Sequence, residues 1–115
     1  PLMQNVAQVA IMTALYAGCS EIYLLGCDHD WLKAARGKGP QRSQDTHFFQ
    51  GASLEGHGGV LDESYKTQMY VCLSIWTGYE ALLAMAEARG VAIRNAAAGG
   101  FLDVFPRVRF ESLFA

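Results

Sequence analysis

Apolar positions near the start of the chain recur at helical spacing. Residues 2–17 carry such a series, and Gly18 follows as a stop signal. This pattern predicts a helix with Asn5 or Gln4 as its N-cap. Because the segment is unusually apolar, we expect it to pack on a sheet and to be covered on more than one side. The positions expected to share the buried face are Val6, Val9, Ala10, Thr13, Ala14 and Ala17.

Residues 21–26 form the clearest predicted strand. Ile22 to Leu25 is a continuous apolar run, which is typical of a strand that is buried on both faces of a parallel sheet. Gly26 ends the run, and an acidic turn with Asp28 and His29 follows. Since ligands of open α/β sheets bind beyond the carboxyl ends of the strands, we expect this turn to lie at a binding site.

A second helix and a second strand are predicted later in the chain. Residues 62–89 carry apolar positions that step by three and four, with Asp62 as a predicted N-cap and Gly90 as a stop. Residues 91–93 predict a short strand, and 102–105 an extended segment. The helical stripe expected to face the core is Tyr65, Met69, Cys72, Trp76, Tyr79, Leu83 and Ala86.

This order of elements predicts an α/β fold, a Rossmann-like partial parallel sheet flanked by helices. Residues 33–60 hold half of the chain's 12 glycines, and a connection of this length is expected to be a lid-like loop. Two or three strands are few for an independent sheet. We therefore expect residues 1–115 to be one α/β domain. It would be the C-terminal part of a larger Rossmann-like domain, or it would form a homo-oligomer that completes the sheet.

Composition narrows the class of protein. The chain has 115 residues, of which 51% are hydrophobic and 17% charged, with a formal net charge of −2. These values are typical of one small globular domain and do not favour nucleic acid as a partner. No apolar run reaches the roughly 18–20 residues of a membrane span, so no transmembrane segment is expected. The three cysteines have apolar neighbours and no metal-like spacing, which predicts buried thiols in a reducing, cytoplasmic compartment.

Candidate chemistry begins with Asp28, His29 and Asp30. Two carboxylates around an imidazole can bind a divalent ion or orient a general acid or base. The equally simple alternative is a solvated turn in which Asp28 caps a short helix over 31–35. The histidines of the chain match no zinc spacing, so we expect no metal site.

Two further polar residues are candidates for the same site. His47 lies between Thr46 and an aromatic pair on the lid-like loop, and an imidazole that is neutral at pH 7 can deprotonate an acceptor hydroxyl. Asn95 follows the second strand, where its amide could bind a base or a ribose edge. The alternatives are a loop histidine bonded to backbone and an ordinary turn asparagine.

Three segments together resemble a known group of proteins. They are Ala14 to Gly18 with Glu21 to His29, then Thr46-His47-Phe48-Phe49, and finally Val91 to Asn95 followed by Leu102 to Pro106. In this order they are similar to bacterial sialyltransferase-like glycosyltransferases and to the related MptE-like (DUF115) group. The chain departs from the sialyltransferase pattern in two ways. It has no tyrosine between Lys33 and Gly59, and it has Asp30 where that group has an aromatic hydroxyl.

The resemblance implies a domain that binds a sugar nucleotide and transfers the sugar to a hydroxyl of a glycan or protein acceptor. It implies His47 as the base and no cofactor. The nucleotide-binding residues would be Gly26, Asp28, His29, Asp30 and Asn95. Two other functions remain open. One is an ATP-dependent pyrophosphokinase of the MptE-like type, in which Asp28 and Asp30 would hold Mg²⁺. The other is a non-catalytic, oligomerising interaction module.

Overall fold

The computed structural model describes residues 3–29 and 64–115. The chain forms two compact units, one from residues 1–29 with 74–115 and the other from residues 30–73. The lid-like loop expected at 33–60 and the cap expected at Asp62 lie outside the described residues. The elements, in chain order, are α1 (Val6–Tyr16), β1 (Glu21–Leu24), α2 (Tyr65–Glu87), β2 (Ala92–Asn95) and the short 3-10 helix η3 (Phe110–Leu113).

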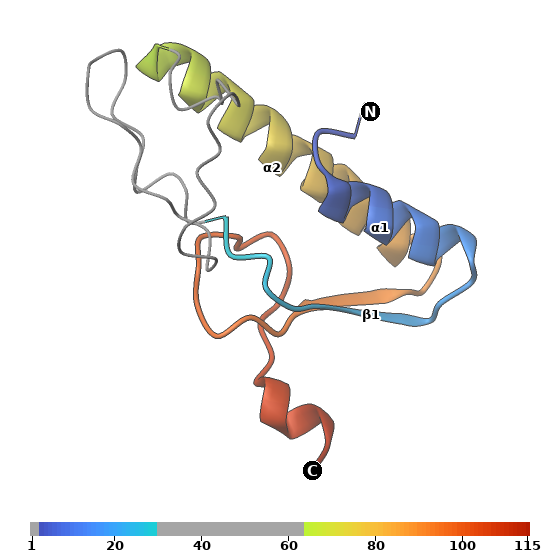
Figure 1. Ribbon diagram of the computed structural model, residues 1–115. Coiled ribbons are helices and arrows are strands. Elements are labelled where there is room, and N and C mark those ends of the chain that lie inside the picture. The colour runs from blue at the N-terminus through green and yellow to red at the C-terminus, as the bar shows by residue number, and fades with distance from the viewer. Residues whose placement is uncertain (1–2, 30–63) are drawn as a thin grey trace. The chain divides into compact units, whose positions relative to one another are not determined.

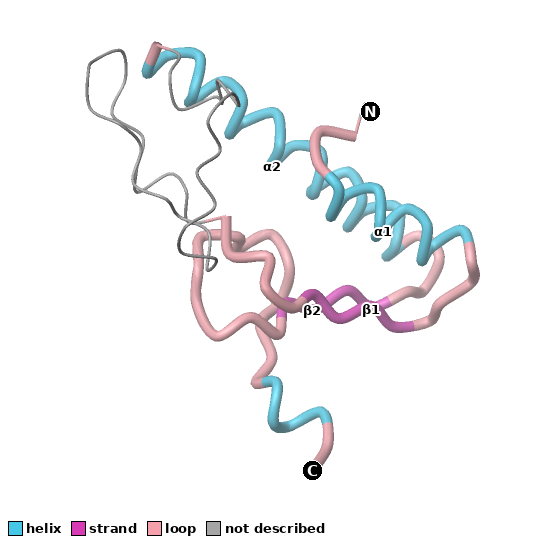
Figure 2. Tube along the Cα trace, in the orientation of Figure 1, coloured by secondary structure: helices cyan, strands magenta, loops and turns pink. Residues whose placement is uncertain are grey.

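The two strands pair in parallel, which confirms the predicted mixed α/β character (Figure 2). Glu21 lies opposite Ala92, and Leu24 lies opposite Asn95. The first strand ends earlier than predicted because Gly26 takes a φ of +73° and turns the chain. The second strand begins one residue later than predicted and extends to Asn95.

The sheet buries one face in the described part of the chain. Leu24 and Ile93 are buried, whereas Tyr23 is 39% exposed and Leu25 is 61% exposed. Figure 1 shows α1 and the C-terminal part of α2 on the same side of the strand pair. The prediction of a first strand buried on both faces was therefore wrong for the described residues, because their helices cover only one face.

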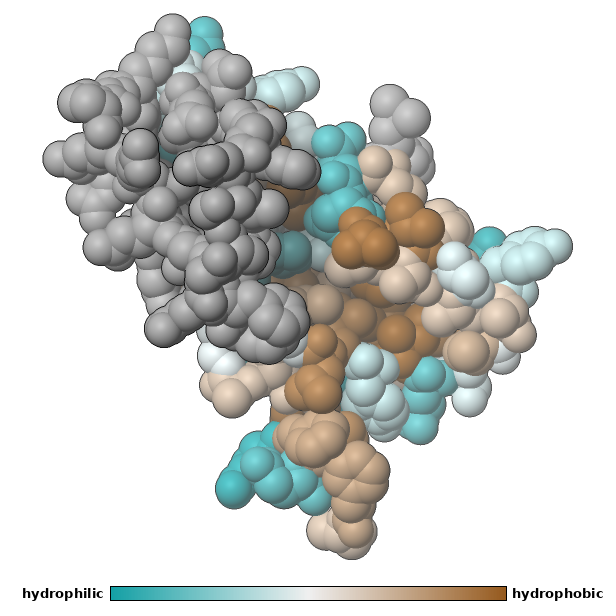
Figure 3. Space-filling model, viewed as in Figure 1, coloured by the Kyte–Doolittle hydropathy of each residue, from teal (hydrophilic) through white to brown (hydrophobic). Residues whose placement is uncertain are grey.

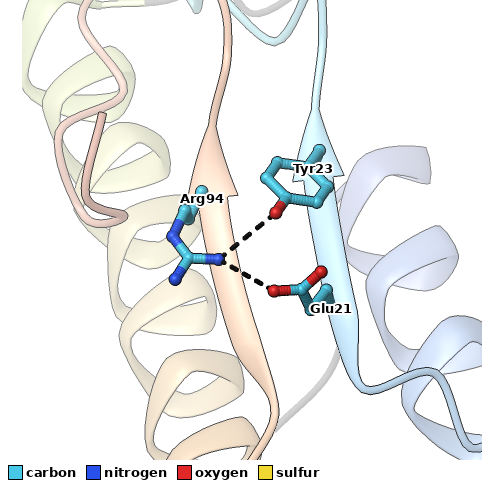
Figure 4. A network of polar contacts seen from close by, with 3 residues as sticks. All are labelled: Glu21, Tyr23 and Arg94. Atoms are coloured by element: carbon cyan, nitrogen blue, oxygen red, sulfur yellow. Dashed lines mark hydrogen bonds and ion pairs between the residues drawn. The ribbon is translucent and has the colours of Figure 1, made fainter. Parts of the chain in front are cut away.

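A polar network occupies the opposite face of the sheet (Figure 4). The Arg94 guanidinium lies 3.5 Å from the Glu21 carboxylate and 3.4 Å from the Tyr23 hydroxyl. Its central carbon is 5.9 Å from the centre of the Tyr23 ring. These side chains are solvent-accessible, so such a network contributes only about 0–1 kcal/mol to stability.

The N-cap of α1 agrees with the sequence, but the helix begins at Val6 instead of residue 2, and its buried face differs from the predicted one. Asn5 is the N-cap, and its side-chain oxygen accepts a hydrogen bond from the Gln8 amide at 3.0 Å. The buried residues of α1 are Gln8, Ile11 and Leu15, whereas Val6 on the predicted face is 83% exposed. The predicted face was wrong because α1 itself carries small apolar residues on all of its sides. Hydropathy therefore does not distinguish one side of this helix from another.

Gln8 is buried because both groups of its amide find backbone partners. Its Nε2 donates to the Ile75 carbonyl at 2.8 Å, and its Oε1 accepts from the Gln4 amide at 2.7 Å. Gly78 makes room for this side chain, since a Cβ there would lie 2.6 Å from Gln8 Nε2. A polar residue thus takes a core position that hydropathy assigns to an apolar one.

The core of the first unit lies along α2. Tyr79 and Ala86 of the predicted stripe are fully buried, but Tyr65 is exposed. Ile75 and Leu82, which the stripe omitted, are buried as well. The Tyr79 ring packs edge-to-face on Phe105, with ring centres 5.6 Å apart. Gly90 ends the helical region with a φ of +69°, as predicted.

The length and composition of α2 would also suit a membrane span. Among the helices in the described ranges, it alone is long and apolar enough to cross a membrane. Core helices of soluble proteins meet the same criterion, and several α2 side chains are fully buried in the first unit. The expectation of no transmembrane segment therefore stays a prediction.

The thiols are less buried than the sequence suggested. All three cysteines are free, with Cys19 exposed and Cys27 and Cys72 only half-buried. The prediction of three buried thiols was wrong, because apolar neighbours in sequence do not ensure burial in the fold.

Exposed hydrophobic side chains also gather over α1 and in the C-terminal segment (Figure 3).

Candidate functional site

The chain segments that follow β1 and β2 meet at the carboxyl ends of the two strands. The Phe101 amide donates to the Asp28 carbonyl at 2.7 Å. Gly100 has a φ of +90°, and a Cβ on it would lie 2.4 Å from the Asp28 carbonyl oxygen. Only glycine allows this approach, because any side chain would meet backbone. The predicted turn residue Asp28 is thereby placed beside the loop that follows β2.

Two positive φ angles shape the turn after β1. Gly26 adopts a φ of +73° and His29 a φ of +50°. A residue other than glycine in this region carries strain of roughly 1–2 kcal/mol. His29 is held there by contacts of its ring, which lies 5.8 Å from the centre of Trp76 and 5.4 Å from that of Tyr79.

His29 belongs to a chain of hydrogen-bonded side chains that starts at the cap of α1. His29 Nε2 lies 2.6 Å from the Tyr79 hydroxyl oxygen. The same hydroxyl lies 3.2 Å from Asn5 Oδ1. Three elements distant in sequence thus contribute one polar group each: the turn after β1, the middle of α2 and the start of α1. We call Asn5, Tyr79 and His29 the polar triad.

Burial keeps the two ionisable members of the polar triad neutral at pH 7. Loss of solvent lowers the pKa of His29 from its ordinary value of 6.5, and the Asp28 carboxylate opposes this shift. Loss of solvent raises the pKa of Tyr79 to about 12, and the hydrogen bond to Asn5 opposes that shift. The imidazole is therefore an available proton acceptor, and the phenol keeps its proton.

Asn95 has the structural role of a turn asparagine, which is the alternative to nucleotide binding that the sequence left open. It ends β2 instead of following it, and its side chain is fully buried. Its Nδ2 donates to the Leu102 carbonyl at 3.0 Å, and its Oδ1 accepts from the Ala97 amide at 2.9 Å. Both side-chain groups hold the loop after β2, which corrects the expectation that this amide faces a nucleotide.

Arg107 supports the same loop from its exposed side, and no sequence pattern pointed to it. Its guanidinium donates to the carbonyls of Ala97, Gly99 and Gly100 at 3.2, 3.0 and 3.0 Å. The backbone beside it also pairs with β2, because the Asn95 amide donates to the Pro106 carbonyl at 2.8 Å. No sequence pattern indicates that a single arginine after a proline will donate hydrogen bonds to the carbonyls of a glycine-containing loop. Only the fold identifies this role.

The remaining predicted site residues divide into two groups. Gly26, Asp28 and His29 lie together at the carboxyl end of β1. Asp30 and His47 lie outside the described residues. Within the described ranges, no group of three or more His, Cys, Asp or Glu side chains is placed to hold a metal ion.

Comparison with known proteins does not add to this geometry. No family model, curated protein or solved structure matches the chain. The features of the described part of the chain that can carry a function are the polar triad and the junction between Asp28 and the loop after β2.

The buried Tyr79 hydroxyl predicts how stability depends on alkaline pH. In the unfolded chain this phenol ionises near pH 10, whereas in the fold it stays protonated until about pH 12. Its contribution is thus fully present below pH 10 and is lost as pH rises through 12. The slope it adds is at most about 1.4 kcal/mol per pH unit.

Urea unfolding of the wild type and of Tyr79→Phe between pH 8 and pH 12 measures this slope. We expect the variant to lose less stability than the wild type over that range. An identical decline in both proteins would contradict the assignment. The exposed Tyr23→Phe is the matched control and should decline as the wild type does.

Proposed function

We propose that this chain forms part of a glycosyltransferase-like α/β domain, which binds a sugar nucleotide and transfers the sugar to an acceptor hydroxyl of a glycan or protein. The observation that carries the proposal is the polar triad at the carboxyl ends of parallel strands, where ligands of open α/β sheets bind. The resemblance of Glu21–His29 and Val91–Asn95 to sialyltransferase-like sequences supports the same function.

The proposed reaction needs a donor, an acceptor and a base. A histidine accepts the proton of the acceptor hydroxyl, whose oxygen forms a bond to the anomeric carbon. The bond between that carbon and the phosphate oxygen breaks, and the nucleotide leaves with the electron pair. The donor would lie against Gly26 and Asp28. His47 is the base that the resemblance suggests.

A thermal-shift experiment on the full 115-residue chain tests this function. The ligands are CMP, CDP, UDP, GDP and ATP, each with and without Mg²⁺. A ligand that binds only the folded chain adds about 2.7 kcal/mol at 100 times its Kd, which raises the Tm by several degrees. We expect a rise with a pyrimidine nucleotide that does not require Mg²⁺.

Other outcomes identify the alternatives. A rise with ATP and Mg²⁺ alone would contradict the transferase proposal and favour a pyrophosphokinase. No rise with any nucleotide would also contradict it and favour an oligomerising interaction module. Arg94→Gln, on the opposite face of the sheet, is a matched control that should respond to nucleotides as the wild type does.

A further inference from the structure

We propose that His29 is the general base of this site, that it accepts the proton at Nδ1, and that Tyr79 and Asn5 are positioning residues that select the required tautomer of its imidazole. The identity of the deprotonated group, an acceptor hydroxyl, rests on the proposed function. The tautomer of the imidazole does not, because it follows from three hydrogen bonds within the chain.

The orientation of the Asn5 side-chain amide is fixed by its role as N-cap. As the N-cap of α1, Asn5 presents a side-chain atom to the Gln8 backbone N–H at 3.0 Å. That atom must be the oxygen, because an amide NH₂ would oppose another donor. Asn5 Nδ2 is buried and has no hydrogen-bond partner among the described residues. The capping bond therefore decides which way the amide points.

The Tyr79 hydroxyl has a single proton, so it can donate only one hydrogen bond. Asn5 Oδ1 can only accept, so the contact of 3.2 Å requires Tyr79 to donate to it. The hydroxyl then has only lone pairs to offer His29. In the contact of 2.6 Å, His29 Nε2 must therefore be the donor. The neutral imidazole consequently carries its proton on Nε2 and its lone pair on Nδ1.

Nδ1 is the atom of His29 whose lone pair can accept a proton. Within the described residues Nδ1 has no hydrogen-bond partner, so the described part of the chain leaves its lone pair unused. A base that is oriented through its other nitrogen by a fixed side chain is the arrangement found in hydrolytic triads. Protonation at Nδ1 leaves the bond from Nε2 to Tyr79 intact, so the polar triad tolerates both charge states.

The charged and titratable neighbours suit this role. Asp28 lies next to His29 in the chain, and its carboxylate favours the imidazolium that forms when the proton is accepted. Cys27 and Tyr79 remain protonated, because burial raises the pKa of both groups. Trp76 lies against the ring and is itself held by Asp103, which accepts from the indole Nε1 at 2.9 Å.

Imidazole ¹⁵N NMR of the full chain tests the tautomer without any ligand. At pH 8 we expect the His29 signals to show a protonated Nε2 and a bare Nδ1. Tyr79→Phe should shift His29 toward a mixture of tautomers, whereas Asn5→Asp should retain the Nε2–H form, because a carboxylate still accepts from Tyr79. Tyr23→Phe is the matched control. A predominant Nδ1–H form, or no change in Tyr79→Phe, would overturn the assignment.

Measurements of kcat test the base itself. The substrate is a sugar nucleotide built on the nucleotide that raises the Tm, and the reaction followed is its hydrolysis. His29→Gln should lower kcat by roughly 10²–10⁴-fold at saturating concentrations of the sugar nucleotide. The wild-type kcat should fall at acid pH as His29 becomes protonated. The proposal would be overturned if His47→Gln lowered kcat while His29→Gln kept the wild-type kcat. Absence of any nucleotide-dependent rise would contradict the proposed function, and the NMR result would show separately whether the tautomer is correct.

Discussion

Replacement of Asn95 by alanine is expected to lower the free energy of unfolding by about 3 kcal/mol. Asn95 is fully buried and bridges the Ala97 amide and the Leu102 carbonyl. The Leu102 carbonyl keeps a long contact of 3.4 Å to Arg107, but the Ala97 amide loses its side-chain acceptor. Each buried polar group without a partner costs about 1–3 kcal/mol, and the truncated side chain leaves a small cavity in addition.

Urea denaturation with linear extrapolation measures this change. Arg94→Ala is the matched control one position earlier on the same strand. Its side chain lies in the accessible network with Glu21, so it should change stability by less than about 1 kcal/mol. If Asn95→Ala stayed within about 0.5 kcal/mol of the wild type, the structural role of this amide would be wrong.

Replacement of Gly100 by alanine is expected to cost about 2–5 kcal/mol and to disturb the turn after β1. The φ of +90° strains any residue with a Cβ, by roughly 1–2 kcal/mol. The added carbon would also meet three backbone atoms of Asp28 at 2.4 to 2.8 Å. Backbone cannot move aside as a flexible side chain can, so overpacking adds a further 1–3 kcal/mol.

Gly99→Ala provides the matched control in the same loop. A Cβ on Gly99 would meet nothing within 4 Å, so we expect a change of less than about 1 kcal/mol. The two variants are compared by urea denaturation, and the His29 ¹⁵N shifts report whether the turn has moved. Equal stability of the two variants would contradict the close approach between Gly100 and Asp28.

Local signals in the sequence predicted the N-cap of α1 and the glycines that follow both helical regions, whereas the ends of the strands differed by one or two residues. Asn5 caps α1 because its short side chain reaches the Gln8 amide of the first turn. Gly18 and Gly90 follow the helical regions with φ values of +82° and +69°, which glycine adopts without strain. The parallel pairing of the two strands was predictable as well, because a helix stands between them in the chain. All of these features depend on residues close together in sequence or on the order of the elements.

The buried faces and the polar triad were decided by the tertiary structure. Hydropathy chose the wrong side of α1, because Gln8 becomes a core residue only once Ile75 and Gly78 accept its side chain. Arg107 meets the carbonyls of the loop after β2 only because the chain returns beside β2 after Pro106.

Within the described residues, the sequence by itself determined where chain segments begin, turn and end, since those choices depend on backbone dihedral preferences and capping a few residues apart. Only the tertiary structure decided that His29 meets Tyr79, 50 residues away, and that Tyr79 meets Asn5, 74 residues away. A hydrogen bond between distant residues requires the elements to be packed first, and no periodicity along the chain encodes that geometry.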